Sequence, residues 1–202
     1  MPKTKYLLIN PKSPEPGRIK EAVKVLKEGG IAAFPTETVF GLAALADNRK
    51  AVKRIYRLKK RRITKRLTIQ VDSPKKILNI IPEIPDRAGI LLKKFSPGPI
   101  TLILKKKKGS VGIRIPNHKI GLAILKKVRA PLVVTSANLS GKKDFKTGKQ
   151  VKKAFWGKIE LIVDGKEKIC GQPSTVVDLT KAKWRILRTG RISAKEIKKA
   201  LC

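Results

Sequence analysis

Cysteine and histidine are scarce in this chain of 202 residues. Cys170 and Cys202 lie far apart and lack the paired spacing that zinc and redox sites need, so we expect neither a disulfide framework nor a cysteine-ligated metal. His118 is the only histidine, which excludes every mechanism that needs two imidazoles. We interpret His118, beside Asn117, as a structural or surface residue.

Long apolar runs are absent as well. Tyr6 to Ile9 and Gly30 to Pro35 fall far short of the roughly 20 residues that a membrane-spanning helix needs. The N-terminus is basic, but its apolar stretch is too short for a signal peptide, and Asn10-Pro11 interrupts it. We therefore expect a cytoplasmic protein with no membrane partner.

Acidic residues are few, because 14 Asp and Glu stand against 49 Lys and Arg, for a net charge of +35. The long-range field of such a charge attracts polyanions, which makes RNA the expected partner. A lysine-rich proteome or a solubility effect is the alternative explanation. Aromatic residues make up only 4%, which argues against an extensive platform for stacking bases.

The hydrophobic residues, 41% of the chain, suffice for a core, and their spacing predicts a mixed α/β fold. We find no repeat and no long linker, so a single domain should fill nearly the whole chain. Helices are predicted at about 17–28, 51–58, 73–82, 88–95 and 122–128, from Thr147, and from the capping box at Ser193. Strands are predicted at 31–34, 67–71, 100–104, 111–115, 131–134, 159–163, 175–177 and 184–187.

Four polar segments border these strands, at 36–38, 59–65, 135–141 and 173–175. Open α/β sheets present ligand-binding groups beyond their strand ends, so the four segments could converge on one cleft. Neither GxxxxGK[ST] nor GxGxxG occurs, so side chains must hold any nucleotide. Their cations, hydroxyls and amide suit phosphate and carboxylate oxygens. Taken singly, each segment also fits a solvated face, a strand end or a helix cap.

Several motifs in fixed order carry a family resemblance. They are residues 30–42 (GIAAFPTETVFGL), Lys59 with Arg61, and residues 97–101, 111–116, 131–141, 173–178 and 186–188. Over roughly residues 15 to 200 the chain resembles the YrdC/Sua5 family of threonylcarbamoyl-AMP synthases, in its short YrdC form. The resemblance implies a single-domain YrdC-like fold at 15–201, a twisted mixed β-sheet flanked by helices around a basic concave cleft. It also implies a short N-terminal segment, 1–14, and no second domain.

The resemblance further implies an enzyme that uses ATP, L-threonine and bicarbonate or CO2. Its products would be pyrophosphate and threonylcarbamoyl-AMP, the precursor of the t6A37 modification of tRNA. Mg2+ would be bound through the phosphates without side-chain ligands, and no tightly bound organic cofactor is expected. The expected partners are RNA or tRNA and the tRNA threonylcarbamoyl transferase machinery. One alternative is a non-catalytic, RNA-binding YciO-like member. Another, a relative of the carbamoyl-adenylate-forming part of hydrogenase maturation proteins, is disfavoured because their accessory domains are absent.

The site residues implied by the resemblance fall into three groups. The catalytic residues are Lys59, Arg61, Ser136 and Asn138. The threonine-binding residues are Thr38, Gln70, Arg114 and Ser174. The ATP-binding residues are Lys59, Arg61, Lys65, Thr135, Ser136, Asn138, Ser140 and Arg188. Departures from the usual family pattern occur at Lys60, Arg62, Arg66, Gln70 and Thr189, and Gln70 stands where longer members have a histidine.

Overall fold

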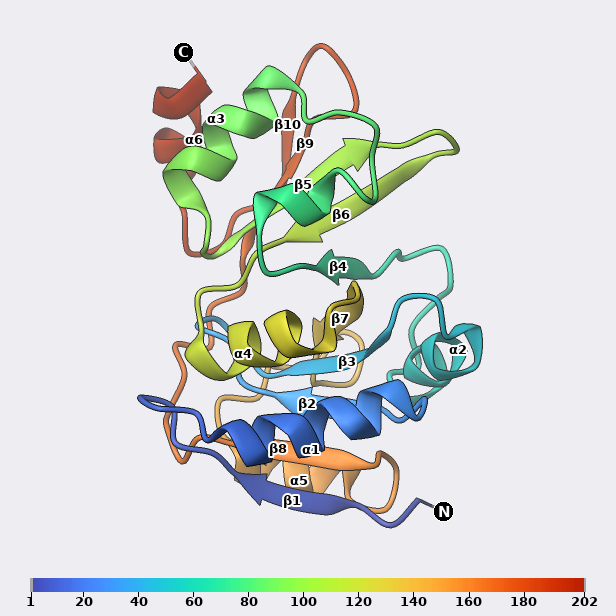
Figure 1. Cartoon of the computed structure of the whole chain (residues 1–202). Helices are drawn as coiled ribbons and strands as arrows, with labels where there is room; N and C mark the ends of the chain where they lie inside the picture. Colours follow the sequence, from blue (N-terminus) through green and yellow to red (C-terminus); the bar gives the residue numbers. More distant parts are fainter. Residues whose placement is uncertain (1, 202) are drawn as a thin grey trace.

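The computed structural model describes residues 2–201, which form one mixed β-sheet covered by helices (Figure 1). The ten strands have the order β1-β8-β2-β3-β7-β4-β6-β5-β9-β10. The strands are β1 (Lys5–Leu8), β2 (Ala32–Phe34), β3 (Gly41–Leu45), β4 (Thr68–Gln70), β5 (Ile100–Lys105), β6 (Ser110–Arg114), β7 (Leu132–Ser136), β8 (Leu161–Asp164), β9 (Thr175–Asp178) and β10 (Arg185–Arg188). The helices are α1 (Pro16–Lys27), α2 (Arg49–Leu58), the 3-10 helix η1 (Pro74–Ile77), α3 (Asp86–Phe95), α4 (Lys119–Val128), α5 (Gly148–Phe155) and α6 (Ala194–Leu201).

Three hydrophobic clusters hold the helices on the sheet. Because alternate residues of a strand point to opposite faces, Ala32 and Phe34 pack under α1 and α4, whereas Ala33 packs with α2 and α5 on the other face. A third cluster joins α3 and α6 to β5, β6 and β9. The helices of the first two clusters surround the half of the sheet that contains β1, and those of the third cover the other half (Figure 1).

The short strand β4 joins the two halves of the sheet. It pairs antiparallel with β7, with Thr68 opposite Val134, and parallel with β6, with Gln70 opposite Arg114. The antiparallel pair of β3 and β7 sets Gly41 opposite Ser136. This register brings the turn before β3 next to the end of β7, although about a hundred residues of chain separate them.

Three parts of the fold differ from the sequence-based expectations. Segment 1–14, of which residue 1 lies outside the described range, contributes the edge strand β1, which pairs parallel with β8. Strand β3 was not predicted, because its sequence GLAAL has neither alternation nor β-branched residues. The helix predicted from Ser73 to Pro82 was wrong. Only the 3-10 helix η1 forms, and Ser73 makes no side-chain cap at its start.

The remaining predicted helices and strands are present, with ends that differ by a few residues. The predicted capping box at Ser193 forms, since its hydroxyl accepts a hydrogen bond from the Glu196 backbone. A second capping box, which was not predicted, begins α5, where Thr147 accepts from the Gln150 backbone. Within residues 2–201, no helix is long and apolar enough to cross a bilayer.

Candidate active site

A polar cavity of about 120 Å3 is lined by residues from both halves of the sheet. Its walls carry four arginines and several hydroxyl groups, which gives it the chemistry of an anion-binding site. The lining residues are Thr36, Val39, Gly41, Arg61, Arg66, Leu67, Thr68, Gln70, Thr101, Arg114, Val134, Thr135, Ser136, Asp144, Pro173, Ser174 and Arg188.

Lys59 follows α2 and is buried, with only 1% of its surface exposed. Its ammonium donates to the carbonyls of Ser136 and Asn138, and to Asn138 Oδ1 at 2.9 Å. Ser136 Oγ also donates to Asn138 Oδ1, at 2.7 Å, and the backbone N–H of Ser140 donates to the Lys59 carbonyl at 2.9 Å. Lys59 therefore ties the end of α2 to the loop that follows β7.

Burial lowers the pKa of Lys59 to about 8. The nearby positive charge of Arg61 contributes to this lowering of the pKa, and the carboxylate of Asp144 opposes it. The Lys59 ammonium is thus held near the Arg61 guanidinium. Its hydrogen bonds to oxygens of Ser136 and Asn138 offset only part of the free energy that burial of its charge costs.

Arg61 reaches the cavity because the loop after α2 wraps around its side chain. Its Nε donates to the Lys65 carbonyl and its Nη2 to the Arg66 carbonyl, both at 3.0 Å. The left-handed φ of 48° at Lys60 turns the chain between the buried Lys59 and the cavity-lining Arg61. Burial lowers the pKa of Arg61. Lys59 and Arg61, two residues apart, therefore occupy different positions: Lys59 is buried behind the cavity lining, and Arg61 forms part of it.

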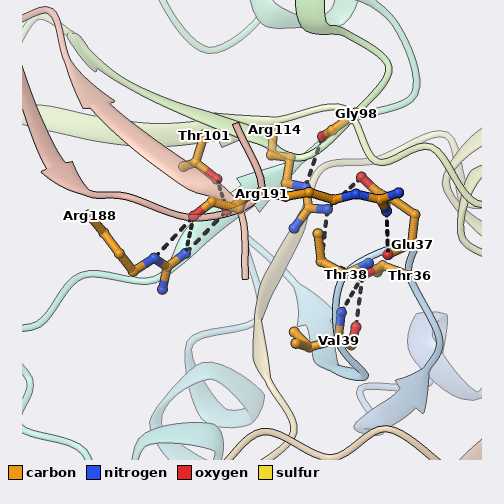
Figure 2. A network of polar contacts seen from close by, with 10 residues as sticks. Thr36, Glu37, Thr38, Val39, Gly98, Thr101, Arg114, Arg188 and Arg191 are labelled. Atoms are coloured by element: carbon orange, nitrogen blue, oxygen red, sulfur yellow. Dashed lines mark hydrogen bonds and ion pairs between the residues drawn. The ribbon is translucent and has the colours of Figure 1, made fainter. Parts of the chain in front are cut away.

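Arg114, at the end of β6, is the centre of a buried polar network (Figure 2). Its Nη2 donates to Glu37 Oε1 at 2.7 Å and to Thr38 Oγ1 at 2.9 Å, and its Nε donates to the Gly98 carbonyl at 3.2 Å. Thr36 shapes the turn that carries Glu37 and Thr38, because its hydroxyl donates to the Val39 carbonyl at 2.7 Å. This network holds the Arg114 guanidinium at the cavity wall.

Arg188 of β10 is held along the cavity by Ser174. Its Nε and Nη2 donate to the Ser174 carbonyl at 3.1 and 2.9 Å, and Nη2 also reaches Ser174 Oγ at 3.1 Å. The Ser174 and Thr101 hydroxyls lie 2.8 Å apart, and Figure 2 shows Arg188 pointing toward this group. Burial lowers the pKa of Arg188, the charge of Asp144 raises it, and Arg114 and Arg61 lower it.

Gln70 of β4 also lines the cavity and is 4% exposed. Its Oε1 is buried and accepts no hydrogen bond from any residue within 2–201. A buried acceptor without a partner costs free energy, so this oxygen is suited to receive a donor from a bound molecule.

The structure brings most of the predicted site residues together. Thr38, Lys59 and Asn138 lie behind the lining, each bonded to a lining residue. Lys65 is exposed and Ser140 half-buried, and neither lines the cavity. The predicted residues in the lining are Arg61, Gln70, Arg114, Thr135, Ser136, Ser174 and Arg188.

Sequence reasoning missed several members of the site. Glu37 lies inside a quoted motif, and its ion pair with Arg114 could not be read from a pattern of residues. Asp144 gave a weak signal, as the single acid among the basic residues 142–146. The further lining residues that were not predicted as site residues include Thr36, Arg66, Thr68, Thr101 and Pro173.

Metal-binding clusters and thiols are not part of this cavity. Within residues 2–201, no group of three or more His, Cys, Asp or Glu side chains is placed to hold a metal ion. His118 is buried outside the lining, with Nε2 2.9 Å from Glu167 Oε1. Cys170 is exposed, and Cys202 lies outside the described residues.

Curated proteins of similar sequence share one name. A threonylcarbamoyl-AMP synthase of Pyrococcus abyssi is 39% identical over 93% of this chain and 58% of its own length. One of Bacillus subtilis is 35% identical over 89% of this chain and 55% of its own length. The chain thus spans somewhat more than half of these two relatives. A putative threonylcarbamoyl-AMP synthase of Methanocaldococcus jannaschii is 35% identical, over 86% of each chain.

Solved structures show the same fold. The crystal structure of P. abyssi Sua5 complexed with L-threonine superimposes with a TM-score of 0.93 at 37% identity, over 98% of this chain and 61% of that one. E. coli YciO superimposes with a TM-score of 0.87 over 96% of this chain and 99% of its own. At 24% identity, YciO supports the fold alone.

The family model for Sua5, YciO and YrdC, described as "Telomere recombination", matches residues 24–190. The match covers most of the chain and includes the turn at 36–39, the Lys59–Arg61 loop, the end of β7 and Arg188. The YrdC-like fold expected from the sequence is confirmed by these structural neighbours. On the family match, the sequence relatives and the shared fold together, this chain belongs to the Sua5/YciO/YrdC family.

Proposed function

We propose that this protein synthesises threonylcarbamoyl-AMP from L-threonine, bicarbonate or CO2, and ATP, with release of pyrophosphate. The names of its relatives and the threonine complex of P. abyssi Sua5 support the proposal. The observation that carries it is a single cavity whose walls bring Arg61, Arg114 and Arg188 together with Gln70, Ser136 and Ser174. The phosphates of ATP and the carboxylate of threonine could thus lie side by side.

On the phosphate side, the protein acts by positioning and charge. The threonine amine adds to CO2 and releases a proton, which gives a carbamate. A carbamate oxygen then forms a bond to the α-phosphorus while the bond from that phosphorus to pyrophosphate breaks, so this second step redistributes negative charge without a demanding proton transfer. Arg61 and Arg188 supply rigid guanidinium donors at the cavity wall. Lys59 holds Ser136 and Asn138 in place beneath them. One well-placed donor in such a site is typically worth roughly 3 kcal/mol of transition-state stabilisation.

On the threonine side, Arg114 is the natural partner for the substrate carboxylate. Thr38 and Glu37 fix its guanidinium, so less conformational entropy is lost when the substrate binds. The unpartnered Oε1 of Gln70 can accept an N–H or O–H of threonine. Ser174 lines the same cavity and accepts a hydrogen bond from Arg188, so its hydroxyl could contact either substrate.

The product would serve the t6A37 modification of tRNA, through a tRNA threonylcarbamoyl transferase. Mg2+ would enter with ATP on the phosphates. The net charge of +35 supports a role for RNA or tRNA as a binding partner. These partner assignments follow from the proposed activity and the charge together.

A substrate-omission assay tests the proposal. Purified protein with ATP, threonine, bicarbonate and Mg2+ should release pyrophosphate, and omission of any one of them should stop the release. The adenylate product should be detected by mass spectrometry. Pyrophosphate release that does not require threonine would contradict the proposal.

A second candidate function is non-catalytic RNA binding, as in a YciO-like member of the family. The charge of +35 favours this candidate, since 49 basic residues far exceed what one nucleotide site requires. Tight RNA binding together with no pyrophosphate release under the complete conditions would select it over the synthase.

A further inference from the structure

Asp144 is the only acidic residue that lines the cavity within residues 2–201, where it shares the walls with four arginines. Its carboxylate forms no ion pair within 4 Å and no side-chain hydrogen bond with the described residues. A carboxylate next to several guanidinium groups normally pairs with one of them. Both carboxylate oxygens of Asp144 are therefore able to contact a bound group.

The backbone on both sides of Asp144 is held in place. Before it, the Lys142 carbonyl accepts a hydrogen bond from Asn138 Nδ2. After it, the Phe145 carbonyl accepts from the Phe40 N–H at 3.4 Å, and the Phe145 ring packs edge-on against Phe155 with the centroids 6.4 Å apart. Asp144 thus sits on an anchored segment at the cavity wall.

The charge of Asp144 acts on Arg188, which is proposed to bind phosphate, and on Lys59, which lies behind the cavity lining. It raises the pKa of Lys59 and of Arg188, in opposition to burial. A carboxylate in this position repels a bare polyphosphate, which weakens the very site that the arginines build. The repulsion becomes attraction if a divalent cation lies between the carboxylate and the phosphates.

Mg2+ commonly binds in this way, through one or two carboxylates together with phosphate oxygens of the substrate. A single aspartate among arginines fits that pattern, because the guanidinium groups neutralise the phosphates while the carboxylate is left for the metal. The donor set therefore suits a metal-bound nucleotide better than a metal-free one.

We propose that Asp144 is the protein's own ligand to the Mg2+ carried by the nucleotide, and that it selects metal-bound over metal-free ATP. The proposal rests on the proposed function, in which the cavity binds ATP. It replaces the expectation that no side chain contacts the metal.

The test measures binding, and it needs no catalysis. Calorimetry gives the affinity of wild-type protein for α,β-methylene-ATP with Mg2+ and with EDTA, and then that of Asp144→Asn. In wild type, Mg2+ should tighten binding. In the variant this Mg2+ effect should fall by at least about tenfold, while affinity in EDTA stays equal or rises. Electron paramagnetic resonance with Mn2+ should show weaker metal binding in the variant's nucleotide complex.

Two further variants make the result specific. Asp47→Asn removes the same charge from an exposed residue outside the cavity lining, and it should behave as wild type. Asp144→Glu keeps a carboxylate and should retain part of the Mg2+ effect. Circular dichroism at the assay temperature checks that each variant is folded.

The contrary outcomes are distinct. If Asp144→Asn bound the analogue more tightly than wild type by the same factor with Mg2+ and with EDTA, Asp144 would only repel phosphate. That result would overturn the inference. Unchanged affinities in both conditions would overturn it as well. Failure of the wild type to bind the analogue in either condition would instead overturn the proposed ATP site, and the inference with it.

Discussion

Glu37 Oε1 lies 2.7 Å from Arg114 Nη2, in an ion pair whose side chains are only 13% and 6% exposed. The pair joins the turn before β3 to the end of β6, and so links the two halves of the sheet at the cavity. Glu37 Oε2 is buried and accepts no hydrogen bond from the described residues. Burial of the two charges therefore costs desolvation free energy that the contacts of the pair offset only in part. The structural effect of such a pair is to fix the positions of its two side chains.

Removal of this carboxylate should destabilise the fold. Glu37→Ala leaves the buried Arg114 charge without its partner, and we expect a loss of about 3 to 5 kcal/mol in the free energy of unfolding. Urea denaturation measures the loss. The matched control is Glu21→Ala, which breaks an exposed pair with Lys5 and should cost about 1 kcal/mol or less. Equal losses in the two variants would contradict the assignment.

The depressed pKa of Lys59 predicts a pH dependence of stability. Between pH 8, the folded value, and pH 10.5, the ordinary value, the unfolded chain binds more protons at Lys59 than the folded chain. The stability of wild type relative to Lys59→Met should therefore rise with pH across this window, by roughly 3 kcal/mol. Denaturation of both proteins at several pH values checks the sign. A difference that stays constant or falls would contradict the lowered pKa.

Arg61 should be required for turnover because its guanidinium lines the cavity in a fixed orientation. Arg61→Ala should lower the rate of threonine-dependent pyrophosphate release by about 100-fold or more, with little change in thermal unfolding. Arg62→Ala is the matched control, since Arg62 is exposed and does not line the cavity. An Arg61→Ala rate equal to that of the control would remove Arg61 from the site.

RNA binding, if it follows from charge, should depend steeply on salt. The turn between β5 and β6 exposes a run of lysines at 105–108, which is a candidate contact with phosphates. Replacement of Lys106, Lys107 and Lys108 by Ser should reduce the slope of log affinity against log salt by about 0.7 to 0.9 for each lysine that contacts a phosphate. Fluorescence anisotropy with labelled tRNA measures the slope. An unchanged slope would place the RNA contacts elsewhere.

Local sequence patterns predicted most of the elements because their causes are local. The apolar spacing of Ile19, Val23 and Leu26 and the capping box at Ser193 each act within a few residues. Strand β3 escaped prediction because Gly41–Leu45 is buried between β2 and β7, and both faces of the strand accept small apolar residues. The helix predicted at 73–82 failed because its start was inferred from Ser73-Pro74, and Ser73 makes no side-chain cap in the structure.

For the candidate site too, some features follow from the sequence and others only from the tertiary structure. By itself, the sequence determined which groups are available: a chain of charge +35, motifs rich in cations and hydroxyls, and almost no imidazole or thiol. Only the tertiary structure decided that Lys59 is buried while Arg61 faces the cavity, that Glu37 pairs with Arg114, and that Asp144 stands among the arginines. The reason is physical, because charge and propensity belong to single residues and short segments. Burial and pairing, by contrast, arise from contacts between strands and loops far apart in the chain.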